Sequence, residues 1–327
     1  MSQTGQRLEH VQLNVKDMGK ALDFYQNVMG LVEIARENNV VYLGCGYDEN
    51  FGLAIMEGGT GIQHFAMRMD TEEELEHYYH KLSTNGVKTE WHNGTEPGQE
   101  KGLRFHLPSG IAMELALVKD NRYLNPSRPA YRSNGLRPLN IDHINIMCNN
   151  VKRDTKFLQN ILDYKISDIV EPEEGFWAFS FTRAKDYHHD IAFVVTKDEA
   201  NTLHHIAWSM ANFEHIKVAC DILAQSGYKL EFGPGRHPIG PNLYAYFQEP
   251  GGNRFELIAE QSVLPAAAPT KIWTSMKDTL EEWSDVTPPA SFLKGSLTSS
   301  KMDGSVSGRL VGHVNDWHAY RALCICS

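Results

Sequence analysis

The chain has 327 residues, of which 42% are hydrophobic and 22% are charged, and its formal net charge is −10. This length and composition are typical of a globular protein with two domains of ordinary size. The negative charge argues against nucleic acid and anionic membrane surfaces as partners, because both attract basic faces.

Neither the start of the chain nor its cysteines indicate export or a membrane span. Residues 1–5 are polar, no signal-peptide pattern follows them, and no run of about 18 apolar residues occurs. The five cysteines are scattered, at Cys45, Cys148, Cys220, Cys324 and Cys326. We therefore expect reduced thiols and a cytoplasmic protein.

The N-terminal part predicts two successive rounds of strand, helix and further strands. In the first round we expect a strand over residues 10–15 and a helix over 17–28 that is capped by Asp17. Two further strands are expected over 40–44 and 52–56. In the second round we expect a strand over residues 64–69 and a helix over 71–85 that begins with a capping box at Thr71. Two further strands are expected over 103–107 and 113–117.

The second half of the chain repeats the first. Three blocks recur in the same order at offsets of 133, 141 and 142 residues: HVQL (10–13) and HINI (143–146), IQHFA (62–66) and LHHIA (203–207), and EL (114–115) and EL (256–257). Such a repeat indicates a tandem duplication. We predict an α+β fold of two domains, each built from two βαβββ units.

Composition divides the chain further. We expect a first domain over residues 1–120, a linker rich in Pro, Arg and Asn over 121–138, and a second domain over 139–262. A C-terminal extension over 263–294 and a disordered Ser/Gly-rich tail over 295–327 are expected to follow. Within the extension, an amphipathic segment over 272–283 predicts a short helix.

A candidate metal site comes from three strands of the second domain. His143, His205 and Glu256 lie at repeat-equivalent positions, 62 and 51 residues apart. Two imidazoles and one carboxylate form the facial set of non-haem Fe(II) oxygenases, which leaves one face of the metal open for substrate and dioxygen. Each residue alone could be an ordinary core or surface residue, but three at equivalent strand positions favour a metal site.

Three further side chains could assist chemistry at this site. His189 begins a predicted strand, and His237 follows a predicted turn over residues 233–236. Tyr246 precedes Glu256 by ten residues, which places both on one face if the strand phase is kept. An imidazole can take and return a proton near neutral pH, and a phenol can donate a hydrogen bond without ionising.

These motifs resemble the type I extradiol dioxygenases of the vicinal oxygen chelate superfamily, such as catechol 2,3-dioxygenase and homoprotocatechuate 2,3-dioxygenase. Residues 246–257 (YFQEPGGNRFEL) are similar to the family signature around its carboxylate ligand, and 203–205 (LHH) resemble its double histidine. The chain departs from the pattern at Gln248 and Glu249, where an Asp commonly precedes the Pro. The resemblance covers about residues 5–290, with strong motifs only in the second half.

The resemblance implies an enzyme that inserts both atoms of O2 into a catechol next to its vicinal diol, in the degradation of aromatic compounds. It implies that His143, His205 and Glu256 bind Fe(II), with Mn(II) as the alternative. The expected partners are a catecholic small molecule, O2 and further copies of the chain in a homo-oligomer.

The resemblance also implies roles for the other three residues. His189 would be the acid/base near bound dioxygen, and His237 and Tyr246 would contact the diol oxygens. The alternatives are that the two histidines are exposed surface residues and that Tyr246 belongs to a strand core.

The first domain retains His10, His64 and Glu114 at the triad positions but not the assisting residues. The positions that match His189, His237 and Tyr246 hold Asn50, Glu96 and Arg104. A cationic Arg beside a divalent metal is unfavourable. We therefore expect a structural first domain and a catalytic second one.

The pocket is expected to be apolar, with the extension closing over it. Phe181 and Phe232 favour an uncharged or alkyl- or aryl-substituted catechol, whereas Arg236 could meet a carboxylate. Two other functions remain open: another metal-dependent enzyme of the superfamily, such as a glyoxalase or epimerase, and a binding protein of the bleomycin-resistance type, which needs no metal ligands.

Overall fold

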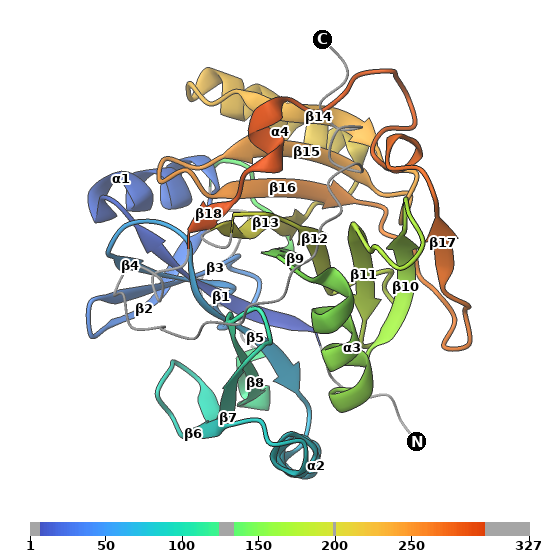
Figure 1. Cartoon of the computed structure of the whole chain (residues 1–327). Coiled ribbons are helices and arrows are strands. Elements are labelled where there is room, and N and C mark those ends of the chain that lie inside the picture. The colour runs from blue at the N-terminus through green and yellow to red at the C-terminus, as the bar shows by residue number, and fades with distance from the viewer. Residues whose placement is uncertain (1–6, 124–133, 199–200, 298–327) are drawn as a thin grey trace.

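The computed structural model describes residues 7–123, 134–198 and 201–297 (Figure 1). Most of the predicted linker and nearly all of the predicted disordered tail, with Cys324 and Cys326, lie outside the described residues. The described chain forms two mixed sheets that lie against each other, with short helices packed on them.

The first sheet has eight strands in the order β2-β3-β4-β1-β5-β8-β7-β6. The central strands β1 and β5 are antiparallel, and each pairs in parallel with the last strand of its own unit, β4 or β8. Its elements are β1 (Leu8–Val15), α1 (Met18–Asp23), β2 (Val32–Glu37), β3 (Val40–Gly44), β4 (Leu53–Glu57), β5 (Ile62–Met69), α2 (Glu72–Thr84), β6 (Thr89–His92), β7 (Gln99–His106) and β8 (Ala112–Val118).

The second sheet repeats this plan in the order β14-β15-β16-β13-β9-β12-β11-β10-β17, with β18 beside β13. Its elements are β9 (Asn140–Cys148), α3 (Val151–Ile161), β10 (Lys165–Val170), β11 (Phe179–Arg183), β12 (Ile191–Val195), β13 (Asn201–Ser209), α4 (Phe213–Gln225), β14 (Leu230–Arg236), β15 (Leu243–Gln248), β16 (Arg254–Ala259), β17 (Lys271–Trp273) and β18 (Ser296–Leu297). Both sheets consist of two βαβββ units, so the predicted α+β fold with a tandem duplication is confirmed.

Local sequence explains where the helices begin and end. The Asp17 side chain accepts the backbone N–H of Lys20 at 3.0 Å, and the Thr71 hydroxyl accepts that of Glu74 at 3.2 Å, as the capping patterns predicted. Helix α1 is shorter than expected, because residues 24–28 continue as a π-helical turn. Strands β2 and β6 escaped prediction because both are edge strands with few buried side chains.

Two predictions about the second domain are wrong. Residues 233–236 belong to strand β14 rather than to a turn. Of the short helix expected within 272–283, only a 3-10 turn at Lys277–Thr279 forms, and Lys271–Trp273 instead adds strand β17 in parallel to β10. Strand β17 satisfies backbone groups on β10 that a sheet edge would otherwise leave unpaired, and local amphipathicity does not reveal that gain.

The two domains share one hydrophobic core, and residues of the first domain pack against strand β16, which carries Glu256. Residues of both sheets belong to a single buried cluster. The ring of Tyr25 in the first domain lies 6.0 Å from that of Phe255 on β16. The side chain of Asn253 accepts the backbone N–H of Gly61 at 3.0 Å. The first domain therefore supports the site strands of the second.

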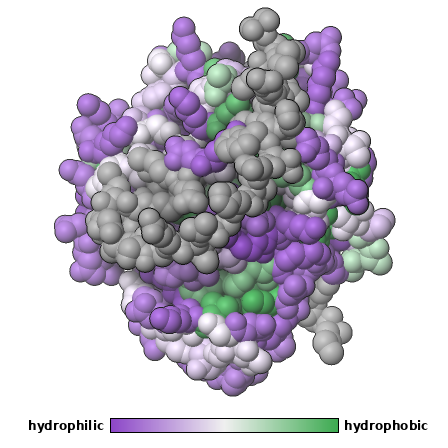
Figure 2. All heavy atoms as spheres, in the orientation of Figure 1, coloured by the Kyte–Doolittle hydropathy of each residue, from purple (hydrophilic) through white to green (hydrophobic). Residues whose placement is uncertain are grey.

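The exterior is largely polar on the face that Figure 2 shows. The face in Figure 2 is mostly hydrophilic, with hydrophobic residues gathered mainly below the centre of the view. No helix among the residues that the structure describes is long and apolar enough to cross a membrane.

Candidate active site

Three neighbouring strands of the second sheet bring the predicted metal ligands together. His143 lies on β9, His205 on β13 and Glu256 on β16. The two Nε2 atoms are 3.2 Å apart, and each lies 3.1 Å from Oε2 of Glu256. All three side chains are buried. Residues separated by 51 and 62 positions in the sequence thus present three donor atoms at one point.

This arrangement fits a divalent metal ion. Donors that bind an ion at about 2.1 Å and at right angles lie about 3 Å from each other. In the described part of the chain, every ion-pair partner of Glu256 is an imidazole, so this buried carboxylate has no Lys or Arg to balance its charge. Fe(II) and Mn(II) both accept two imidazole nitrogens and a carboxylate oxygen.

Each histidine of the candidate metal site is oriented through its other nitrogen. His143 Nδ1 lies 2.9 Å from a carboxylate oxygen of Asp142. His205 Nδ1 lies 2.6 Å from Nδ1 of His204, whose Nε2 donates to the carbonyl oxygen of Phe292 at 2.9 Å. Such contacts fix the ring orientation and leave Nε2 for the metal.

Without a metal, the charges within the cluster stabilise one another. Burial disfavours a charged His143, but Asp142 and Glu256 outweigh burial and raise its pKa to about 9. Burial lowers the pKa of His205 to about 4, although Glu256 opposes this change. Burial raises the pKa of Glu256, but contacts with the three imidazoles outweigh it and hold that pKa well below its usual range. Metal binding would release the proton that His143 otherwise holds.

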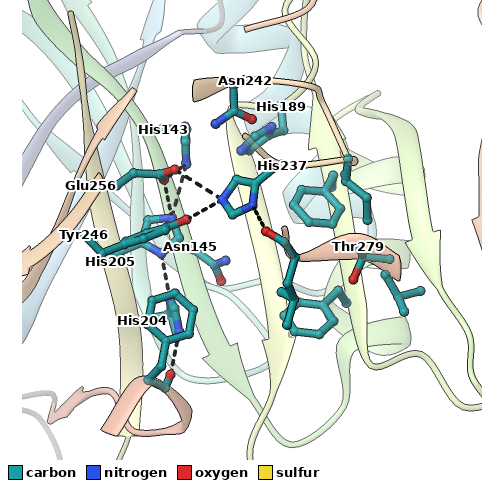
Figure 3. A pocket seen from close by; sticks show the side chains of 16 residues that line it. His143, Asn145, His189, His204, His205, His237, Asn242, Tyr246, Glu256 and Thr279 are labelled. Carbon is teal, nitrogen blue, oxygen red and sulfur yellow. Dashed lines mark hydrogen bonds and ion pairs between the residues drawn. The ribbon is translucent and has the colours of Figure 1, made fainter. Parts of the chain in front are cut away.

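The three assisting residues surround the candidate metal site (Figure 3). The ring of His189 lies 4.1 Å from that of His143. His237 accepts the Tyr246 hydroxyl at 3.0 Å through Nε2, and its Nδ1 donates to the carbonyl oxygen of Leu280 at 2.6 Å. Tyr246 lies directly opposite Glu256 across the β15–β16 ladder, so the predicted shared face is confirmed.

A cavity opens beside these residues, and the empty space in it, together with the solvent at its mouth, amounts to about 560 Å³. Its wall combines the site residues with apolar side chains from β10, β11, the β14–β15 loop and the extension: Val170, Phe179, Phe181, Ile239, Leu280 and Phe292. A second cavity of about 460 Å³, almost wholly apolar, shares four wall residues with the first: Phe179, His204, Leu280 and Phe292. The extension therefore closes one side of the site.

Some pocket residues differ from expectation. Phe181 lines the cavity as predicted, whereas Phe232 does not and instead packs against Tyr246, at 6.3 Å between rings. Arg236 points away and pairs with Glu260 at 2.6 Å. The sequence analysis missed other wall residues. Asn145 could have been found by its period-2 spacing from His143, whereas Thr279, Leu280 and Phe292 reach the site only through tertiary folding.

The first domain forms a different cluster at its equivalent position. His10 and His64 face Glu96 rather than Glu114, at 3.0 and 3.1 Å, through two different carboxylate oxygens. Arg104 binds Glu114 at 2.6 Å and lies 3.2 Å from His64 Nε2. Here each imidazole can donate to its own oxygen of Glu96, and Arg104 supplies the positive charge. The two imidazoles thus face different oxygens of Glu96, whereas both imidazoles of the second domain face the same oxygen of Glu256. The side chains of His10, His64 and Glu96 nevertheless lie close enough together to hold a metal ion.

Comparison with known proteins agrees with this architecture. The family model "Glyoxalase/Bleomycin resistance protein/Dioxygenase superfamily" matches residues 7–115 and 140–257. The chain is 30% identical to the manganese-dependent 2,3-dihydroxybiphenyl 1,2-dioxygenase of Geobacillus genomosp. 3 over 270 residues, which cover 76% of this chain and 84% of that protein. It is 28% identical to the metapyrocatechase of Geobacillus stearothermophilus, over 79% of this chain and 82% of that protein.

A solved structure extends the likeness to three dimensions. The 2,3-dioxygenase LapB of Pseudomonas sp. KL28 superposes with a TM-score of 0.77 at 27% identity, over 83% of this chain and 98% of that one. These findings confirm the resemblance stated above. The chain belongs to the glyoxalase, bleomycin resistance protein and dioxygenase superfamily.

Proposed function

We propose that the protein is an extradiol ring-cleavage dioxygenase that acts on catechols in the degradation of aromatic compounds. The observation that carries the proposal is the convergence of His143, His205 and Glu256 beside a cavity that is also lined by His189, His237 and Tyr246. The named relatives are dioxygenases of dihydroxylated aromatic rings, and they support the same activity.

The proposed metal is Fe(II), and Mn(II) is the alternative because one relative is named as manganese-dependent. Bound at His143, His205 and Glu256, either ion would supply open positions for a vicinal diol and O2, together with the one-electron chemistry that O2 requires. The two ions can be told apart by loading metal-free protein with each in turn.

Three residues of the chain then handle protons and charge. His189, whose pKa burial and the neighbouring His143 and His188 hold well below its usual range, is neutral and can accept a proton from the diol. His237 and Tyr246 face the substrate side of the site. Burial and Glu256 raise the pKa of Tyr246 well above its usual range, so its phenol stays protonated and can donate a hydrogen bond to a diol oxygen.

The substrate class is an uncharged catechol with an apolar substituent. Among the described residues that line the cavity, none is a Lys or Arg that could pair with a substrate carboxylate. The adjoining apolar cavity offers room for an alkyl or aryl group beyond Phe179 and Phe292. We also propose a cytoplasmic homo-oligomer; the described cysteines Cys45, Cys148 and Cys220 are free thiols.

Steady-state turnover tests the function directly. Metal-free protein is loaded anaerobically with Fe(II) or Mn(II) and mixed in air with catechol, 3-methylcatechol, 2,3-dihydroxybiphenyl or 3,4-dihydroxyphenylacetate. We expect O2 uptake and a yellow ring-fission product, with the acidic substrate the poorest of the four. Absence of both signals for every diol, in protein that retains its metal, would favour another chemistry of the superfamily or a binding role.

A further inference from the structure

We infer that His188 is a positioning residue that sets the tautomer of His189 and so leaves the His189 Nε2 lone pair free toward the substrate cavity. The inference rests on the proposed function of His189. It concerns a buried histidine that neither binds the metal nor lines the cavity.

The contacts of His188 begin at Asp168 on strand β10. One carboxylate oxygen of Asp168 lies 2.5 Å from His188 Nε2, and the other accepts the indole N–H of Trp273 at 2.5 Å. An ionised carboxylate can only accept, so the His188 proton resides on Nε2. Trp273 belongs to β17, and the C-terminal extension therefore helps to hold this carboxylate.

The same logic continues to His189. His188 Nδ1 is left as an acceptor, and it lies 3.0 Å from Nδ1 of His189. Two imidazole nitrogens at this distance need one donor between them, so His189 carries its proton on Nδ1. Gln261 Nε2 also approaches Nδ1, but at 3.4 Å this contact is longer than the 3.0 Å from His188 Nδ1 and the 3.0 Å at which the amide donates to the His189 carbonyl oxygen. The Nε2 of His189 therefore keeps its lone pair.

The ring of His189 is also held in place. Its centre lies 4.1 Å from that of the His143 ring, with the two planes tilted by 54°, and it forms a T-shaped pair with Phe181 at 5.2 Å between ring centres. Both His189 and Phe181 line the cavity. A base that must take a substrate proton needs its lone pair aimed at the substrate, and a wrong tautomer would present an N–H instead.

A second pair of adjacent histidines uses the same device. His204 Nε2 is fixed by the carbonyl oxygen of Phe292, and His204 Nδ1 lies 2.6 Å from Nδ1 of His205. His205 is thereby left with a free Nε2, which is the atom that converges on the metal site. In both pairs the first histidine is held by a contact that involves the C-terminal extension: His204 contacts Phe292 directly, and His188 contacts Asp168, which binds Trp273. The second histidine of each pair faces the candidate active site.

Two substitutions of His188 distinguish control of the His189 tautomer from a purely structural role in packing. The amide oxygen in His188→Asn can take the place of Nδ1 and accept from His189, whereas the longer His188→Gln keeps a donor near Asp168 but offers no acceptor at the Nδ1 position. We expect His188→Asn to retain kcat within about 5-fold and His188→Gln to lose about 10- to 100-fold. KM for catechol and the metal content should change less than about 3-fold in both variants.

The double variants complete the test. In a His189→Ala background, replacing His188 by Gln should cause no further loss of kcat, because the residue acts through His189. A His188→Gln enzyme that matches wild type, or one more active than His188→Asn, would overturn the inference, as would an additive loss in the double variant. Wild-type protein without dioxygenase activity would instead refute the proposed function itself.

Discussion

Tyr246 lies directly opposite Glu256 across the β15–β16 ladder, and Arg104 lies directly opposite Glu114 at the equivalent place in the first domain. The first pair leaves the Glu256 carboxylate to face imidazoles. The second pair neutralises Glu114, which binds Arg104 at 2.6 Å. The residue opposite the glutamate in each hairpin thus differs between the domains: Tyr246 leaves Glu256 paired with imidazoles alone, whereas Arg104 gives Glu114 an internal ion pair.

Removal of the Tyr246 hydroxyl tests its proposed role. Tyr246→Phe preserves the aromatic contacts with His205 and Phe292 but removes the hydrogen bond to His237. We expect kcat to fall about 10- to 100-fold with metal content unchanged. Steady-state assays with metal analysis of the same samples would measure both quantities. Unaltered kcat would assign the phenol to the strand core alone.

The two domains provide matched histidine variants. His143→Ala removes one of three donors and should abolish metal retention and turnover together. His10→Ala, its repeat equivalent, should leave turnover per folded molecule within a few-fold. Metal analysis after gel filtration and O2 uptake would compare them. Loss of turnover in folded His10→Ala protein would show that the first domain takes part in catalysis.

Arg104→Met should destabilise the protein without removing its activity. Glu114 is fully buried, and loss of Arg104 would leave its charge without a cation. Breaking a buried pair from one side typically costs about 3–5 kcal/mol. We expect a clearly lower Tm, largely restored by the second change Glu114→Gln. A Tm equal to that of wild type would mean that Arg104 does not stabilise the first domain.

Asp190 should make stability depend on pH. Burial raises its pKa from 3.8 to about 7, so the folded state binds the proton more tightly than the unfolded state. Its contribution to stability is present in full below pH 3.8 and is lost as the pH rises to about 7. Asp190→Asn, which stays neutral and can still accept from Ala184, should raise Tm more at pH 8 than at pH 5. An equal gain at both pH values would contradict this assignment.

His189→Ala separates binding from chemistry. The side chain makes no contact with Glu256 or His205 within hydrogen-bonding distance among those that the structure describes, so metal and catechol binding should survive. Loss of a general base should lower kcat about 100-fold or more. The readouts are metal content, anaerobic catechol binding and single-turnover rate. If His189→Ala had the same kcat as wild type, the acid/base role would belong to another residue.

Much of this site could be predicted because the duplication acts as an alignment within one chain. His143, His205 and Glu256 stood out because His10, His64 and Glu114 mark the same strand positions. What escaped prediction depends on tertiary contacts. The repeat placed Glu96 at the position of His237, but the spacing did not reveal that Glu96, rather than Glu114, is the partner of the first two histidines.

The extension illustrates the same limit. The start of its predicted amphipathic segment forms strand β17, because pairing with β10 and the Trp273–Asp168 hydrogen bond outweigh local helical preference, and only a 3-10 turn follows at Lys277–Thr279. Its expected place over the pocket agrees with the structure, since Leu280 and Phe292 line the cavity.

Incorporation of labelled dioxygen tests the central claim most directly. Metal-loaded protein would turn over 3-methylcatechol under ¹⁸O2, with mass spectrometry of the product and Glu256→Ala protein as the control. The account predicts a ring-opened product that contains both labelled atoms before exchange with water, formed by wild type and not by the variant. A product without label, such as a quinone, or equal turnover by Glu256→Ala, would contradict it.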